Sequence, residues 1–204
     1  MHISWLGHAC FVVESAGYQL LLDPYSEVPG CRNVAVTVDG VLCSHDHFDH
    51  AYCQELTLRQ GKENPFCVSV VDTFHDDQQG SLRGTNKIHK LTAEGLSVVH
   101  LGDLGHPLSD AQAESLRGCD VLMIPVGGFF TIDAALAAET VAQLQPRIVI
   151  PMHYRGEGFG FDPIDTVEPF LARFAPEQVQ RLESSELEVT AETPAQVAVL
   201  AFPA

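Results

Sequence analysis

A dense group of metal-binding residue types lies at the end of the first quarter of the chain. Residues 44–50 read Ser-His-Asp-His-Phe-Asp-His, so three histidines and two aspartates fall within six residues. His45 and His47 are two positions apart and share one side of the chain if it is still extended there. Asp49 and His50 would begin the next element and approach from another direction. Zinc, iron and manganese accept imidazole and carboxylate ligands, so this segment predicts a metal site.

Other residues of the same types follow predicted strands elsewhere in the chain. They are His75, Asp103 and His153, which come after the apolar stretches 68–74, 96–102 and 148–152. Loops beyond strand ends gather into one pocket in sheet-based folds, so residues distant in sequence can converge there. Together with the histidine cluster they form a set large enough for two metals, and we expect about two transition-metal ions per chain.

Two arginines lie on loops just after these predicted ligands. Arg83 follows His75, and Arg155 follows His153. A guanidinium presents a planar fork of donors that suits a carboxylate or a phosphate. A pocket that must attract an anion in an acidic protein needs local positive charge beyond the metals. We expect one or both arginines to hold an anionic group of the substrate; the alternative is that both are surface arginines that balance local acids.

The apolar pattern predicts strands in the first quarter and an alternation of strands and helices later. The predicted strands cover 3–6, 9–14, 18–23, 41–44, 66–72, 96–101, 121–125, 147–150 and 197–202. The predicted helices cover 49–59, 109–116, 133–145 and 164–174, and residues 76–87 are predicted to form a loop. Ser109 and Gln112 have the spacing of a capping box. This order favours an α/β fold of two sheets with helices on the outer faces.

Length and composition limit the kinds of protein this can be. The 204 residues suit one domain, spanning 1–204. Eleven Lys and Arg against 27 Asp and Glu give a net charge of −16, which disfavours a nucleic-acid or anionic-membrane binder. The longest strongly apolar stretch, 121–130, is too short to cross a bilayer. We expect a cytoplasmic protein with reduced cysteines and a small-molecule substrate, and the sequence leaves its oligomeric state open.

Several motifs occur in a fixed order over residues 2–155. They are Trp5-Leu6-Gly7-His8-Ala9, Asp23-Pro24, His45-x-His47-x-Asp49-His50, Phe74-His75-Asp76, Gly102-Asp103-Leu104-Gly105-His106, Pro125-Val126-Gly127-Gly128 and Pro151-Met152-His153-Tyr154. With them the chain resembles the metallo-β-lactamase superfamily, and within it the short, lactonase-like branch of predicted metal-dependent hydrolases. The resemblance implies an αββα sandwich of two mixed sheets, with a dinuclear site at one edge of the sheets.

The resemblance also implies a role for each candidate ligand. The residues that match ligands of the first metal are His45, His47 and His75. Those that match ligands of the second metal are Asp49, His50 and His153. Asp103 matches the carboxylate that bridges both ions, and Asp23 matches an acid that supports the histidine loop from behind the ligands.

Two points stay open at this level. The interval from His50 to His75 is short compared with the β-lactamases, so His106, and less plausibly His100, could replace His75. His8 lies at a predicted strand turn, where a hydrogen-bonded structural histidine is favoured over a catalytic one.

The implied chemistry is hydrolysis. A water that bridges two divalent ions has a pKa near 7, so a metal-bridging hydroxide is available to attack a small ester, lactone or phosphoester. Asp49 and Asp103 are the expected catalytic residues, Asp49 because it can orient the hydroxide and take a proton later. Zinc is the first choice of metal, with Mn²⁺ and Fe²⁺ as alternatives. The competing functions are an iron-dependent oxidoreductase on the same scaffold and a metal-binding protein without turnover.

Overall fold

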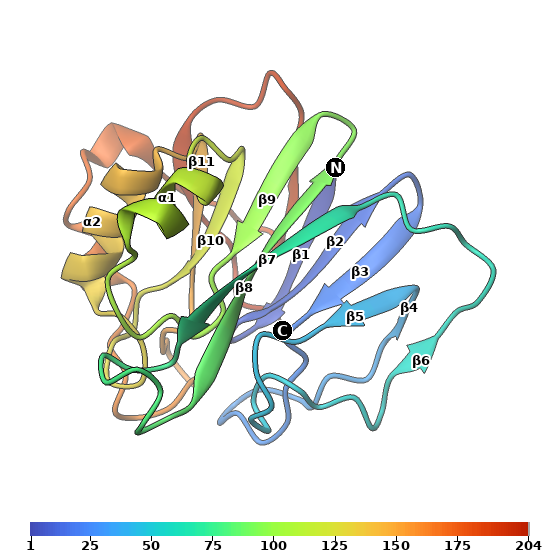
Figure 1. Cartoon of the computed structure of the whole chain (residues 1–204), viewed down its shortest axis with the longest axis horizontal. Coiled ribbons are helices and arrows are strands. Elements are labelled where there is room, and N and C mark those ends of the chain that lie inside the picture. Colours follow the sequence, from blue (N-terminus) through green and yellow to red (C-terminus); the bar gives the residue numbers. More distant parts are fainter. Residues whose placement is uncertain (204) are drawn as a thin grey trace.

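A computed structural model describes residues 1–203, in which two large β-sheets face each other (Figure 1). The first sheet has the strand order β13-β1-β2-β3-β5. Its strands are β1 (His2–Gly7), β2 (Cys10–Ser15), β3 (Tyr18–Leu22), β5 (Gly40–Leu42) and β13 (Glu186–Glu188). β3 and β5 run parallel and the other pairs are antiparallel, so the sheet is mixed.

The second sheet has the strand order β12-β14-β11-β10-β9-β8-β7. Its strands are β7 (Cys67–Phe74), β8 (Thr85–Ala93), β9 (Leu96–His100), β10 (Val121–Pro125), β11 (Ile148–Met152), β12 (Val179–Arg181) and β14 (Gln196–Val199). β9, β10 and β11 are parallel, whereas β8 is antiparallel to both of its neighbours. Every residue of β10 and β11 is buried, which is why these strands are continuous apolar runs in the sequence.

Two helices, α1 (Asp110–Leu116) and α2 (Ala134–Leu144), begin where the sequence predicts them. In α1 the Ser109 side chain accepts from the backbone of Gln112 as part of a capping box. In α2 the Asp133 side chain accepts from the Leu136 amide at 2.8 Å. The helix α3 (Glu168–Leu171) is much shorter than the predicted 164–174. These helices lie together along one side of the seven-stranded sheet (Figure 1).

The main core fills the space between the sheets and continues beneath the helices, and a smaller core lies behind the first sheet. Phe11 and Leu20 alternate in direction with Cys10 and Leu21, so the first pair joins the main core and the second pair the smaller one. The segment 25–38 supplies the rest of the smaller core. The predicted two-sheet α/β fold is therefore confirmed, with one refinement: a long loop, rather than a helix, covers this outer face.

The predicted helix 49–59 does not form. After a turn in which Ala51 N donates to His47 O at 2.8 Å, the chain hydrogen-bonds to a distant segment instead of to itself. Tyr52 N donates to Pro24 O, Thr57 N to Val36 O and Arg59 N to Val38 O. The last two contacts flank a small sheet of β4 (Thr37–Val38) and β6 (Thr57–Leu58). Partners that the local pattern does not contain therefore override the helical pattern.

The predicted loop 76–87 is also too long, because β8 already begins at Thr85 and pairs with both β7 and β9. Ile88 and Leu91 of this strand are buried and belong to the main core. Within residues 1–203, no helix has both the length and the apolar composition needed to cross a membrane.

Candidate metal centre

Strand direction brings the candidate ligands to one edge of the molecule. Because β3 and β5 are parallel, Asp23 and the 43–50 loop leave the first sheet at the same end. In the second sheet β7 and β9 are both antiparallel to β8, so β7 runs in the direction of β9, β10 and β11. His75, Asp103 and His153 follow these strands and leave at their shared carboxyl edge. The topology thus explains why residues so far apart in sequence converge.

All seven expected ligands lie in groups whose donor atoms are within 4.8 Å of one another. One group is His45, His47 and His75. A second is His8, Asp49, His50 and His153. A third is His45, His50 and Asp103. The division follows the assignment to two metals that the resemblance implies, with His8 added to the second set.

Asp103 is buried between the two histidine sets. Its Oδ1 lies 3.2 Å from Nε2 of His50, and its Oδ2 lies 3.2 Å from Nε2 of His75 and 3.3 Å from Nε2 of His153. Burial alone would raise the pKa of Asp103, but the surrounding histidines, led by His153 and His50, hold it well below its usual range. An ionised carboxylate in this position can contact ions held by either set.

Many of the buried donor atoms in this region have no hydrogen-bond partner among residues 1–203. They are Nε2 of His45 and His50, Nδ1 of His75 and His153, both ring nitrogens of His8, and Oδ1 of Asp103. Buried polar atoms are nearly always hydrogen-bonded, so a cluster of exceptions needs an explanation. Imidazole and carboxylate donors that converge without partners fit divalent metal ions.

Asp23 orients two of the candidate ligands from behind. Its carboxylate accepts from the Ser44 amide at 2.7 Å, from the Ser44 hydroxyl at 2.6 Å and from Nδ1 of His50 at 2.8 Å. Because the hydroxyl donates its hydrogen to Asp23, Nδ1 of His45, 2.9 Å away, is the donor to Ser44 Oγ. Both histidines are thereby held as the tautomer that leaves Nε2 free for a metal. Burial opposes ionisation of Asp23, but His100, His50 and Ser44 lower its pKa to about 2.

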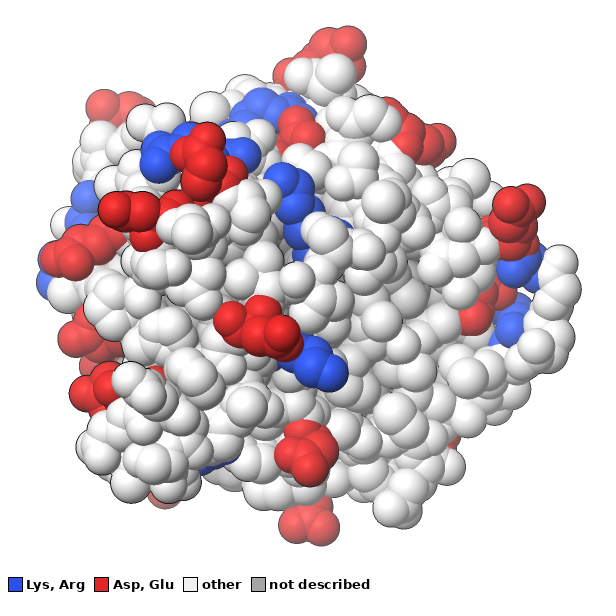
Figure 2. All heavy atoms as spheres, viewed as in Figure 1, with Lys and Arg blue, Asp and Glu red and all other residues white. Residues whose placement is uncertain are grey.

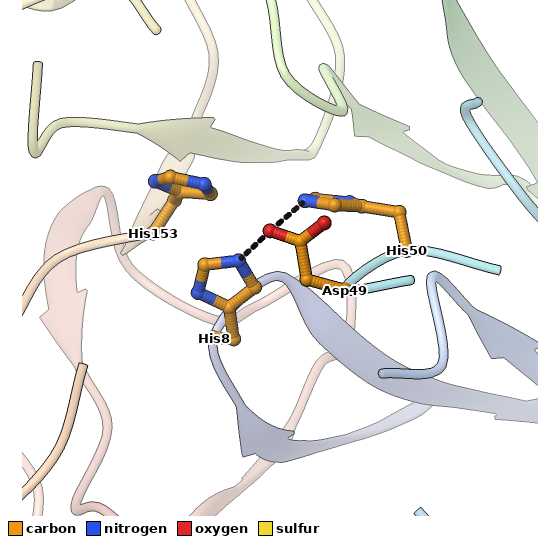
Figure 3. A group of neighbouring side chains, drawn as sticks. All are labelled: His8, Asp49, His50 and His153. Atoms are coloured by element: carbon orange, nitrogen blue, oxygen red, sulfur yellow. Dashed lines mark ion pairs between the residues drawn. The ribbon is translucent and has the colours of Figure 1, made fainter. Parts of the chain in front are cut away.

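His8 is the residue that the sequence reasoning undervalued. It lies in the turn between β1 and β2 with φ +51°, and Figure 3 shows its ring beside Asp49, His50 and His153. Its Nε2 is 3.5 Å from Oδ2 of Asp49, and its ring centroid is 4.1 Å from that of His153. Neither ring nitrogen of His8 has a hydrogen-bond partner within residues 1–203, and His8 belongs to the donor group of Asp49, His50 and His153. In the sequence, the one feature that pointed to His8 as a functional residue was its place in the Trp5-Leu6-Gly7-His8-Ala9 motif.

The backbone of His8 is fixed by contacts on both sides. Trp5 Nε1 donates to the His8 carbonyl at 3.0 Å, and the His153 amide donates to it at 3.2 Å. One carbonyl therefore ties the β1–β2 turn to the loop that carries His153, so the two rings are held together.

The geometry favours His75 over the two alternative histidines. In His106, Nδ1 donates to Pro107 O at 2.8 Å and Nε2 accepts from the Phe74 amide at 3.1 Å. In His100, Nε2 donates to Ala9 O at 2.8 Å and Nδ1 accepts from the Gly102 amide at 3.1 Å. Both nitrogens of each ring are used, whereas Nδ1 of His75 is unpartnered.

A cavity of about 240 Å³ opens over the candidate metal centre. Asp49 and Asp103 are among the ligand candidates that line it, and Phe48, Phe130 and Phe161 add aromatic walls. Arg83 is the one Lys or Arg among its described lining residues. The volume is below the range typical of pockets for drug-sized ligands, so the cavity suits a small molecule.

Arg155 does not share this cavity, contrary to the expectation that it could contact the substrate. It lines a separate hollow that includes Glu157 and Glu168, and its Nε donates to Ile164 O at 2.7 Å. The reason is that the chain turns away from the site directly after Tyr154, which is buried against Trp5.

Charged groups are dispersed on the face shown in Figure 2. Lys and Arg of the described residues occur there singly or in small groups, mostly beside Asp or Glu, and they form no continuous basic surface. This distribution agrees with the strongly acidic composition.

Comparison with known proteins connects this site to a family. The model of the Beta-lactamase superfamily domain matches residues 2–153. A UPF0173 protein of Pyrococcus furiosus is 31% identical over 179 residues, covering 76% of this chain and 83% of the relative. A UPF0173 metal-dependent hydrolase of Hyperthermus butylicus is 26% identical over 190 residues, covering 75% and 83%.

Among solved structures, a protein of Thermotoga maritima assigned to the Zn-dependent hydrolases of the metallo-β-lactamase superfamily is similar over the whole fold. It is 33% identical, with a TM-score of 0.75, and the match covers 98% of this chain and 96% of that one. The range 2–153 that matches the family model spans every candidate ligand described above. From its fold, its motifs and these matches, the chain belongs to the metallo-β-lactamase superfamily.

Proposed function

We propose that this metal-dependent hydrolase works with two divalent ions and cleaves a small ester, lactone or phosphoester. The observation that carries the proposal is the position of Asp103 between two sets of converging donors, several of which are buried and unpartnered. The similarity to a metal-dependent hydrolase of Hyperthermus butylicus and to a Zn-dependent hydrolase of Thermotoga maritima supports the reaction class. The small volume of the cavity supports a small substrate.

The donor sets suggest how two ions would be held. One would bind to His45, His47 and His75. The other would bind to His8, Asp49, His50 and His153, with Asp103 contacting both. When bound, the ions would lower the pKa of water towards neutrality and polarise the bond to be cleaved. Zinc suits this set of nitrogen and carboxylate ligands, and Mn²⁺ or Fe²⁺ can replace it.

The side chains of this protein would carry the remaining steps. The Asp49 carboxylate reaches the cavity, so it can orient the attacking water, accept its proton and pass that proton to the leaving group. Asp23 and Ser44 keep His45 and His50 in the required tautomers. Phe48, Phe130 and Phe161 line the cavity, so a bound substrate would be partly shielded from bulk water, which strengthens the charge interactions inside.

The proposal is tested by loading purified protein with zinc or manganese and counting the ions by elemental analysis. The loaded protein is then screened against phosphodiesters, lactones, esters and thioesters. We expect about two ions per chain and turnover in one of these classes. Failure to take up any metal, even at high zinc or manganese, would overturn the proposal. Native iron together with oxygen consumption and no hydrolysis would favour the oxidoreductase instead.

Substitution of His8 tests whether it is a donor to the second ion. His8→Asn keeps a residue that tolerates a positive φ but removes the imidazole. We expect it to weaken the binding of one ion by roughly tenfold or more, in the range found for lost metal-site contacts, as measured by chelator competition. His89→Asn is the matched control, because His89 is also buried with an unpartnered Nδ1 yet belongs to none of the three donor groups. If His8→Asn and His89→Asn bind metal equally well, His8 is not a metal ligand and its role is structural.

A further inference from the structure

Arg83 brings an unneutralised positive charge to the cavity. The ion pairs formed within residues 1–203 tie Arg59, Arg117, Arg147 and Arg181 to carboxylates, but they do not include Arg83. Instead, the Arg83 guanidinium donates to the Phe129 carbonyl at 3.2 Å, and its central carbon is 5.8 Å from the centre of the Phe130 ring. These contacts occupy part of the guanidinium and leave other N–H donors available. Arg32, Lys87, Lys90, Arg155 and Arg173 also form no ion pair within residues 1–203, but among these cations Arg83 alone lines the cavity.

The loop that carries Arg83 is held by a buried carboxylate. Oδ1 of Asp76 accepts from the amides of Gln78 and Gly80, both at 2.8 Å. Its Oδ2 accepts from the amides of Leu82 at 3.0 Å and of Arg83 itself at 2.8 Å. These four bonds lower the pKa of Asp76 to about 2, although its burial acts in the opposite direction. Asp76 directly follows the candidate ligand His75. The loop therefore begins at the metal centre, and its bonds to Asp76 bring Arg83 back beside the same cavity.

The cavity combines this charge with apolar walls. Phe130 packs edge-on against Phe161, with ring centroids 6.1 Å apart, and Phe48 is 55% exposed. A guanidinium that is already ordered by its loop and by an aromatic ring loses little further conformational entropy when it binds an anion.

We propose that Arg83 forms an anion-binding subsite, and that the substrate carries a carboxylate or phosphate group in addition to the bond that is cleaved. The anion pairs with the fork of Arg83, the compact apolar part of the molecule lies against Phe48, Phe130 and Phe161, and the scissile bond lies over Asp49 and Asp103. This inference deepens the proposed function and rests on it for the position of the scissile bond. The recognition of the anion is independent of turnover.

The test uses metal-loaded protein and pairs of ligands that differ in charge. Monomethyl succinate is compared with its uncharged amide, methyl succinamate, and 2-acetoxyethyl phosphate with 2-acetoxyethanol. Each Kd is measured by calorimetry, or KM is measured where the ester is turned over. Arg83→Gln should raise the value for at least one of the anions by tenfold or more, equivalent to about 1.4 kcal/mol, and change the neutral partner less than twofold. A change limited to monomethyl succinate would indicate a carboxylate ligand, and a change limited to 2-acetoxyethyl phosphate would indicate a phosphate ligand.

Arg155→Gln is the matched control, since Arg155 also follows a candidate ligand but lines a different hollow. It should change neither member of either pair. Equal losses for anion and neutral partner in Arg83→Gln, or no loss for either, would overturn the inference, as would the same anion-specific loss in Arg155→Gln. Charge-dependent binding at Arg83 without hydrolysis of any ester, lactone or phosphoester would refute the proposed function alone. Hydrolysis that is insensitive to Arg83 would refute this inference alone.

Discussion

Asp103→Asn is expected to reduce kcat/KM by about a thousandfold or more while the protein remains folded. The change keeps the shape of the side chain but removes a buried negative charge that lies 3.2–3.3 Å from three histidines. Bound metal ions stabilise transition-state charge by several kcal/mol, so weaker binding of the ions removes that stabilisation, and each 1.36 kcal/mol lost is a factor of ten in rate. Elemental analysis should also show fewer bound ions per chain, and circular dichroism checks that the fold is retained.

The matched control for this variant is Asp46→Asn. Asp46 lies within the same histidine–aspartate motif but is exposed and belongs to none of the three donor groups. We expect nearly normal metal content and activity, because the change removes only a solvated charge. Full metal occupancy and normal turnover in Asp103→Asn would show that the carboxylate is not shared between the ions. Equal losses in both variants would point to a general effect of reduced acidity.

His75→Ala is expected to weaken the binding of one ion by tens of fold or more, whereas His106→Ala should leave the metal stoichiometry intact. His75 lies with His45 and His47 in one donor group, and its loss leaves that group with two ligands. His106 uses both ring nitrogens on the backbone of Pro107 and Phe74. Its removal should therefore cost only about 0.5–1.5 kcal/mol of stability for a lost hydrogen bond. Chelator competition and thermal unfolding measure the two effects separately.

The opposite outcome has a specific meaning. Loss of metal from His106→Ala together with full occupancy in His75→Ala would move the ligand to the Gly102–His106 segment. The backbone amide of Phe74 would then lose its present acceptor when metal binds. Such a result would require the loop after β9 to change its path.

The candidate ligands themselves could be predicted from the sequence because their signals are local. The spacing of His45, His47, Asp49 and His50 is confined to one loop, and each of the other three ligands follows an apolar strand of ordinary length. The carboxyl ends of strands that run in one direction meet at one edge of a sheet. The residue types and the strand pattern together therefore predicted one shared site, and the capping residues Ser109 and Asp133 likewise marked the start of their helices.

Long-range contacts decided what local patterns could not. The segment 49–59 is predicted to be a helix, but the backbone amides of Tyr52, Thr57 and Arg59 donate to the segment 24–38. Arg83 and Arg155 both follow candidate ligands in the sequence, but only Arg83 lines the cavity. The Asp76 carboxylate accepts from the Arg83 amide and holds the Arg83 loop at the cavity. Tyr154 packs against Trp5, and Arg155 after it lines a different hollow.

By itself, the sequence indicated the family, the two-sheet class of fold and seven candidate metal ligands, because motifs and periodicity are properties of neighbouring residues. Only the tertiary structure decided that His8 lies against Asp49 and His153 with both ring nitrogens free. It also decided that His75, rather than His106, faces the site. The physical reason is that a side chain's partners depend on the paths of loops, and those paths are set by packing and hydrogen bonds between segments that are far apart in the chain.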